Sequence, residues 1–66
     1  DLLVKAASGY DCYEIKSSAT FHPDFIKGLN SFEKSFPELT RKKSVIYAGQ
    51  DLPAVGNTSI INYRHI

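Results

Sequence analysis

The sequence contains one cysteine, no methionine and no tryptophan in 66 residues. Cys12 alone can form neither an internal disulfide nor a cysteine-rich zinc site, and a reducing, cytoplasmic setting is therefore expected. No apolar run approaches the roughly 20 residues that span a bilayer, so we expect no membrane partner. The formal net charge of +1 argues against a protein that coats nucleic acid non-specifically, because such proteins are usually clearly basic.

The rest of the composition is that of one small folded domain. Hydrophobic residues make up 42% and charged residues 23% of the chain, which are ordinary values for a globular protein. A chain of this length buries only about 60% of the surface that its unfolded state exposes, so its stability is expected to be marginal. The lack of methionine and the apolar start at residues 1–4 predict that residues 1–66 are a single partial domain, the C-terminal fragment of a longer protein.

Hydrophobic periodicity predicts two strands and then a helix in the first half of the chain. Residues 2–6 and 12–17 are typical of strands, and the turn residues at 7–11 would close them into a hairpin. Pro23 suits the first position of a helix because its missing N–H would be unpaired there anyway. Four apolar residues spaced by four, three and four positions then form one stripe of this helix: Phe25, Leu29, Phe32 and Phe36.

Two more strands are predicted in the second half. Residues 44–48 and 59–66 are rich in β-branched and aromatic residues, and segment 49–58, with its glycines and proline, is predicted as loop. The strand at 44–48 should lie parallel to the strand at 12–17, because a strand, a crossover helix and a second strand normally make a right-handed parallel unit. The expected fold class is α+β (α/β-like), in the order β-β-α-β-β, with a small mixed sheet and one crossover helix. The helix would leave one sheet face open, and a homodimer could form through its apolar residues.

Charged residues recur on one side of the second predicted strand. Side chains alternate along a strand, so Cys12, Glu14 and Lys16 are predicted to share a face, where Cys12 should be a packed core thiol. If the hairpin closes near residue 9, Asp1 comes close to Glu14 or Lys16. Two carboxylates beside a lysine suit Mg²⁺, which takes one or two carboxylates and keeps several waters. On spacing alone, a surface ion pair worth about 0–1 kcal/mol explains these charges at least as well.

This ordered set of features resembles the core of the PD-(D/E)xK nuclease superfamily, through Asp1 and the tripeptide Glu14-Ile15-Lys16. It is still more similar to the C-terminal domain, of unknown function, of bacterial and archaeal AAA-type ATPases. The segments that carry this second likeness are DLLV at 1–4, YEIKSS at 13–18, the helix with Phe25, Lys27-Gly28-Leu29 and Phe32, FPEL at 36–39 and YAG at 47–49. The resemblance implies a truncated restriction-endonuclease-like core. ATP would bind only in an ATPase module outside this chain, which contains no G-x-x-x-x-G-K-[ST] motif.

The resemblance also implies roles for individual residues. Asp1 and Glu14 would bind Mg²⁺, the backbone carbonyl of Ile15 would be a further metal ligand, and Lys16 would assist attack on a nucleic-acid phosphodiester. Weaker contacts to nucleic acid are expected from Ser17, Arg41, Lys42 and Lys43, although three basic residues are also typical of a solvated entry to a strand. The alternative function is a non-catalytic module for protein interaction or dimerisation.

Overall fold

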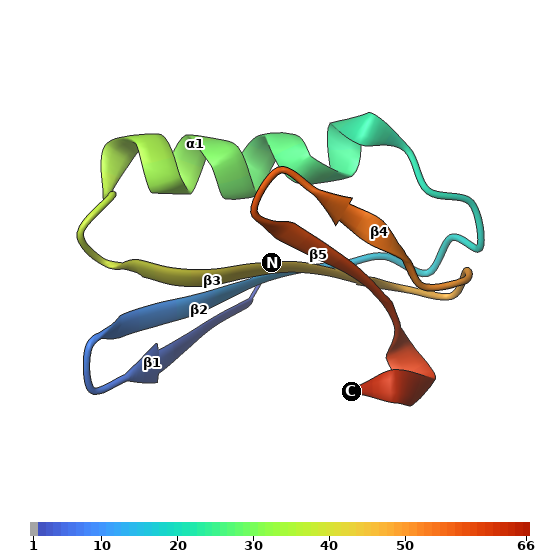
Figure 1. The fold of residues 1–66 in the computed structure, drawn as a ribbon, viewed down its shortest axis with the longest axis horizontal. Helices are drawn as coiled ribbons and strands as arrows, with labels where there is room; N and C mark the ends of the chain where they lie inside the picture. The colour runs from blue at the N-terminus through green and yellow to red at the C-terminus, as the bar shows by residue number, and fades with distance from the viewer. Residues whose placement is uncertain (1) are drawn as a thin grey trace.

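The computed structural model, which describes residues 2–66, contains one mixed five-stranded sheet with an α-helix along one face (Figure 1). The elements in chain order are β1 (Leu2–Ala6), β2 (Gly9–Ile15), the 3-10 helix η1 (Pro23–Ile26), α1 (Lys27–Ser35), β3 (Thr40–Tyr47), β4 (Leu52–Val55), β5 (Thr58–Asn62) and the 3-10 helix η2 (Tyr63–His65). The strand order across the sheet is β1-β2-β3-β5-β4. The predicted small α+β fold with a mixed sheet is confirmed. In the described part of the chain, no helix is long and apolar enough to cross a membrane.

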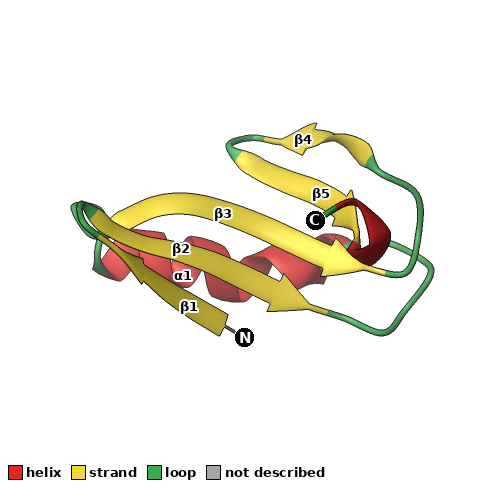
Figure 2. Cartoon of the chain, turned by 90° about the horizontal axis from the view of Figure 1, so that it is seen from below, coloured by secondary structure: helices red, strands yellow, loops and turns green. Residues whose placement is uncertain are grey.

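The sheet combines an antiparallel hairpin with a parallel centre. β1 and β2 pair antiparallel, with Leu2 opposite Tyr13, and β2 pairs parallel with β3. β5 lies parallel to β3 on its other side, and β4 pairs antiparallel with β5 at the far edge (Figure 2). The predicted crossover from β2 through the helix to a parallel β3 is therefore confirmed. Gly9 starts β2 with φ +147°, a conformation that favours glycine.

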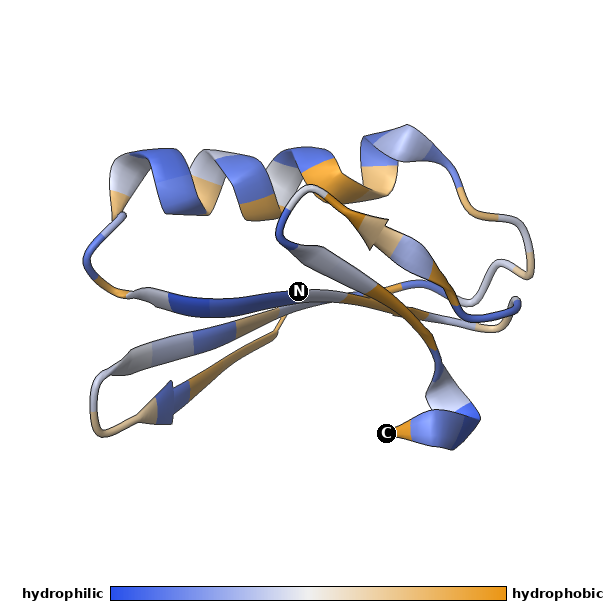
Figure 3. Cartoon of the chain, in the orientation of Figure 1, coloured by the Kyte–Doolittle hydropathy of each residue, from blue (hydrophilic) through white to orange (hydrophobic). Residues whose placement is uncertain are grey.

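The helical segment begins and ends as its sequence predicts. His22 Nδ1 accepts a hydrogen bond of 3.0 Å from the Asp24 N–H and so caps η1, where Pro23 holds the first position. α1 ends at Ser35, two residues before Pro37, because proline cannot continue a helix. Apolar residues of the helical segment turn toward the sheet (Figure 3). The buried hydrophobic cluster between helix and sheet consists of Cys12, Ile26, Leu29, Val45, Tyr47 and Ile60, with Phe25 and Phe32 packed against it.

Five details differ from the predictions. β2 spans Gly9–Ile15 rather than residues 12–17, so the turn is shorter than predicted and Lys16 and Ser17 follow the strand. Segment 49–58 is not all loop, because β4 pairs with β5 at two points within it. β3 begins at Thr40 rather than at residue 44, so the basic run belongs to a strand. The last strand ends at Asn62, whose side chain accepts a 2.8 Å hydrogen bond from the Arg64 N–H and starts η2. Phe36 is 49% exposed, because the helix has already ended there and its side chain leaves the core stripe.

Candidate functional site

β2 brings Glu14 and Lys16 together on the sheet face that α1 covers. Cys12, two residues earlier on that face, is 1% exposed in the core, so the predicted shared face is confirmed. Lys16 Nζ lies 3.1 Å from Glu14 Oε2, and the two side chains are 40% and 12% exposed. The ammonium also lies 5.5 Å from the centroid of the Phe25 ring, within the range of a cation–π contact. The pair therefore joins a shielded carboxylate to a half-exposed cation.

Helix α1 passes over the Glu14 carboxylate at a glycine. A Cβ at Gly28 would lie 3.6 Å from Glu14 Oε1, which is ordinary van der Waals contact. Glu14 and Gly28 line a cavity of about 130 Å³, together with Leu3 and Phe32. A water molecule takes up about 30 Å³ of the liquid, so the space beside the carboxylate has room for a few waters or the edge of a ligand.

The described residues provide one of the acids that a metal site would need here. Asp1, the other predicted carboxylate ligand, lies outside the described residues. Within residues 2–66, no group of three His, Cys, Asp or Glu side chains is placed to hold a metal ion. Ile15 ends β2, and its 55% exposed side chain lies on the opposite sheet face from Glu14. Glu14 alone is an incomplete ligand set for Mg²⁺, which is usually held by one or two carboxylates together with other ligands.

The residues predicted to contact nucleic acid are spread over both ends of the sheet. Ser17 is exposed just after β2 and is next to Lys16. Arg41 and Lys42 are exposed at the start of β3, and Arg41 Nε lies 3.6 Å from an Asp11 carboxylate oxygen. Because β2 and β3 are parallel and Lys42 is opposite Asp11, these two cations lie at the end of the sheet away from Lys16. They therefore do not join the candidate site.

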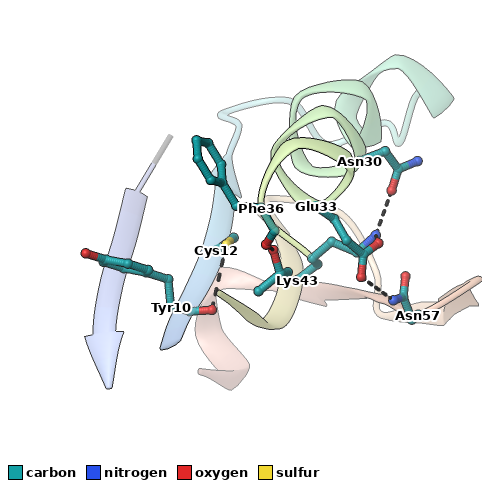
Figure 4. A network of polar contacts seen from close by, with 8 residues as sticks. Tyr10, Cys12, Asn30, Glu33, Phe36, Lys43 and Asn57 are labelled. Carbon is teal, nitrogen blue, oxygen red and sulfur yellow. Dashed lines mark hydrogen bonds and ion pairs between the residues drawn. The ribbon is translucent and has the colours of Figure 1, made fainter. Parts of the chain in front are cut away.

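The structure contradicts the prediction that Lys43 contacts phosphate. Its side chain is 2% exposed, because alternation along β3 turns it under α1. Lys43 Nζ donates 2.7 Å hydrogen bonds to Asn30 Oδ1 and Glu33 Oε1. Glu33 Oε2 accepts a further bond of 3.0 Å from Asn57 Nδ2 in the turn before β5 (Figure 4). The Lys43 hydrogen bond, more than that of Asn57, holds the pKa of Glu33 below its usual value, so this network ties the helix to the sheet.

A second polar cluster lies where β3 and β5 end, and its residues were not predicted as a site. Asp51 Oδ2 lies 2.8 Å from His65 Nδ1, and Asp51 Oδ1 accepts a 2.6 Å bond from the Asn62 N–H. The Asn62 bond first, and the His65 bond second, lower the pKa of Asp51. Asp51 and His65 are separated by 13 residues in the sequence, and no local pattern connects them.

No protein-family model, curated protein or solved structure matches the chain. The likeness to PD-(D/E)xK nucleases and to the ATPase C-terminal domain therefore rests on the sequence features given above. The functions that this likeness implies are proposals.

Proposed function

We propose that the chain is a nuclease-like domain of the PD-(D/E)xK type, which takes part in binding and cleaving a nucleic-acid phosphodiester in a parent AAA-type ATPase. The observation that carries the proposal is the pairing of Glu14 with Lys16 at the end of β2, with Nζ and Oε2 3.1 Å apart. This strand is preceded by an antiparallel partner and followed by a crossover helix and a parallel strand. A helix and a strand also follow the Glu-x-Lys motif in the nuclease superfamily that the sequence resembles.

The two side chains suit different parts of that chemistry. The half-exposed Lys16 ammonium is a cation that can stabilise negative charge developing on a phosphoryl oxygen. The Glu14 carboxylate, beside a small cavity, can accept a hydrogen bond or serve as one ligand of a cation. Mg²⁺ enters this proposal only with Asp1 as a second ligand, and ATP belongs to the ATPase module of the parent protein.

The test is a cleavage assay of the full-length parent on labelled single- and double-stranded DNA and RNA, with Mg²⁺ or Mn²⁺. We expect Lys16→Ala to lower the cleavage rate about 100-fold or more, the scale on which a lost electrostatic stabiliser acts. Lys27→Ala is the matched control, because Lys27 is a 77% exposed lysine in α1, where it pairs with Asp24. Cleavage that Lys16→Ala retains would overturn the role of Lys16, and a parent that cleaves none of these substrates would overturn the proposal.

The open face of the sheet supports a second candidate, a module that self-associates. We use the term open face for the side away from α1, where a groove of about 640 Å³ is lined mainly by apolar side chains: Leu2, Val4, Tyr13, Ile15, Ile46, Ile61, Tyr63 and Ile66. Five of these are at least 43% exposed, so the helix covers only one side of the sheet's apolar surface. A two-fold dimer places the same patch on both partners, so each copy would cover the apolar groove of the other.

Two neighbouring leucines of β1 provide a matched test of self-association. Leu2 and Leu3 are 47% and 48% exposed, but Leu2 lies on the open face and Leu3 on the helix-facing side. We expect sedimentation equilibrium to show a dimer for the wild-type chain and for Leu3→Glu, and a monomer for Leu2→Glu. A monomeric wild-type chain at millimolar concentration, or equal dissociation of both variants, would reject this interface.

A further inference from the structure

A third hollow lies at the carboxyl ends of the parallel strands. We call it the carboxyl-edge cleft. Its volume is about 870 Å³, and its walls are residues 19–21 after β2, residues 47–52 around the end of β3, and Asn62, Arg64 and His65 at the end of β5. These three chain segments leave the sheet at the same edge (Figure 2). The hollow is broad and shallow, and it lies outside the carboxyl ends of parallel strands, the edge at which open α/β sheets bind ligands.

The floor of the cleft is held together by contacts between the segments. The Ala48 N–H donates a 2.9 Å bond to the Ser18 carbonyl, which joins the loops that follow β3 and β2. The Asn62 side-chain amide donates a 2.6 Å bond to the Gly49 carbonyl, which joins β5 to the same loop. A Cβ at Gly49 would collide with the Ala19 carbonyl oxygen and approach a Tyr47 ring carbon to 2.6 Å. The loops are therefore packed against one another before any ligand arrives.

Arg64 and His65, a cation and an imidazole, are among the residues that line the cleft. His65 Nδ1 lies 2.8 Å from Asp51 Oδ2, which orients the ring, and Nε2 can donate to a phosphate oxygen when the ring is in its imidazolium form. Within residues 2–66, no carboxylate forms an ion pair with Arg64, whose Nε lies 3.2 Å from the Tyr63 hydroxyl oxygen. The Arg64 Cζ also lies 5.6 Å from the centroid of the Tyr63 ring, and its planar guanidinium matches the geometry of a phosphate.

Two aromatic residues, Phe21 and Tyr47, also line the cleft. Phe21 lines the cleft and packs edge-to-face against Tyr47, with the ring centroids 6.3 Å apart. Tyr47 is buried, and its hydroxyl bonds to the Gln50 carbonyl, so the half-buried Phe21 ring is the surface available to a ligand. Aromatic faces stack on nucleobases irrespective of their sequence.

From this juxtaposition we propose that the carboxyl-edge cleft binds a nucleoside phosphate, with Arg64 and His65 at the phosphate and the base against Phe21. The phosphate end would be fixed by charge and hydrogen bonds, and the base end by apolar contact. The site does not use Glu14 or Lys16, so it does not rest on the nuclease proposal. The ligand could be a free nucleotide or part of a single strand of nucleic acid, and the test separates these two sources.

The experiment is a titration of the ¹⁵N-labelled chain, followed by amide chemical shifts. The probes are adenosine monophosphate, adenosine, inorganic phosphate and a short single-stranded oligonucleotide. We expect adenosine monophosphate at millimolar concentration to shift the amides of residues 48–51 and 64–65, and to bind more tightly than adenosine or phosphate alone. An oligonucleotide that binds the same residues more tightly still would identify a nucleic-acid strand as the source, and equal or weaker binding would identify the free nucleotide.

Two arginines provide the matched variants. Arg64→Gln is expected to weaken binding of adenosine monophosphate about 10-fold or more, the scale of a lost hydrogen bond between charged groups. Arg41→Gln should leave binding unchanged, because Arg41 lies at the opposite end of β3 and pairs with Asp11. Circular dichroism verifies that both variants are folded. The proposal would be overturned if the two variants weakened binding equally, if phosphate bound as tightly as the nucleotide, or if no amide of the cleft shifted.

Discussion

Replacing Lys43 tests how the helix is held to the sheet. Its side chain is 2% exposed, while that of Glu33, its partner, is 36% exposed. Methionine at position 43 keeps most of the buried aliphatic stem and removes the ammonium. The Glu33 carboxylate then remains in contact with solvent and still accepts the hydrogen bond from Asn57, so no buried charge is left without a partner. Exchanging a buried ion pair for an apolar residue of similar volume is often neutral or stabilising.

The expected magnitudes differ among three variants. Lys43→Met should change the free energy of unfolding by no more than about 1 kcal/mol. Lys43→Ala also removes three buried methylene groups, at about 0.8 kcal/mol each, and should lose about 2–3 kcal/mol. Glu33→Gln should be more destabilising than Lys43→Met, because it leaves a buried ammonium without its counter-charge. In a domain of this size, 1 kcal/mol corresponds to roughly 4–8 °C in Tm.

The same network predicts a pH dependence. The hydrogen bond from Lys43 lowers the pKa of Glu33 below its ordinary value of 4.5. A carboxyl with a lowered folded-state pKa adds stability above its unfolded-state pKa, and this stability is lost as the pH falls through the folded-state value. The wild-type chain should therefore lose more stability than Lys43→Met on acidification below about pH 4.5.

Urea unfolding at neutral pH and at about pH 3.5, followed by far-UV circular dichroism, measures both effects. The wild-type chain and the variants Lys43→Met, Lys43→Ala and Glu33→Gln are compared under the same conditions. The reasoning is refuted if Lys43→Met is as destabilised as Lys43→Ala, because the stem would then contribute nothing. The reasoning is also refuted if Glu33→Gln lowers the free energy of unfolding less than Lys43→Met does, or if Lys43→Met loses as much stability on acidification as the wild type.

Three further predictions concern glycines and the cysteine. Gly9→Ala should lower the free energy of unfolding by more than about 2 kcal/mol, because Gly9 has φ +147° and a Cβ there would collide with the Leu39 carbonyl. Gly56→Ala should lower it by only about 1 kcal/mol, because Gly56 has φ +60° and open space around it. Equal losses for the two variants in thermal unfolding would contradict this. Gly28→Ala should gain about 0.5–1 kcal/mol from helix propensity, because its Cβ has room, and a lowered Tm would contradict the contact described for it. Cys12 is buried, and burial raises the pKa of its thiol, so a thiol reagent should label Cys12 only as fast as the protein unfolds. Labelling faster than unfolding would show that the core opens locally.

The local parts of the fold were predictable because each depends on neighbouring residues. Turn residues define the β1–β2 hairpin, and Pro23 and the apolar stripe define the helix. The parallel pairing of β3 then follows from the crossover rule. β4 was not predictable, because its four residues are all exposed and it includes Pro53. It pairs with β5 at two points only, so its strand character comes from the neighbouring strand rather than from its own sequence.

The site shows the same division between local and distant causes. Alternation along β2 was sufficient to place Glu14 beside Lys16. The burial of Lys43 was not predictable, since a run of three basic residues normally faces solvent. Its partners on the helix lie 10 and 13 residues away in the sequence, and only the packing of α1 on β3 brings them to the ammonium. Both partners, the Asn30 amide and the Glu33 carboxylate, have no local sequence signal for such a role.

The end of the chain connects two of the proposed surfaces. His65 lines both the carboxyl-edge cleft and the groove on the open face. If a second copy docks on the open face and a nucleoside phosphate contacts His65, the two binding events share η2 (Tyr63–His65), through which one can influence the other. By linkage, the factor by which nucleotide changes the dimer dissociation constant must then equal the factor by which dimerisation changes nucleotide affinity. Glu14 and Lys16 lie on the opposite face of the sheet from the groove, so a cleavage activity that depends on them should be insensitive to Val4→Glu, which places a charge in the groove at a residue that does not line the cavity beside Glu14.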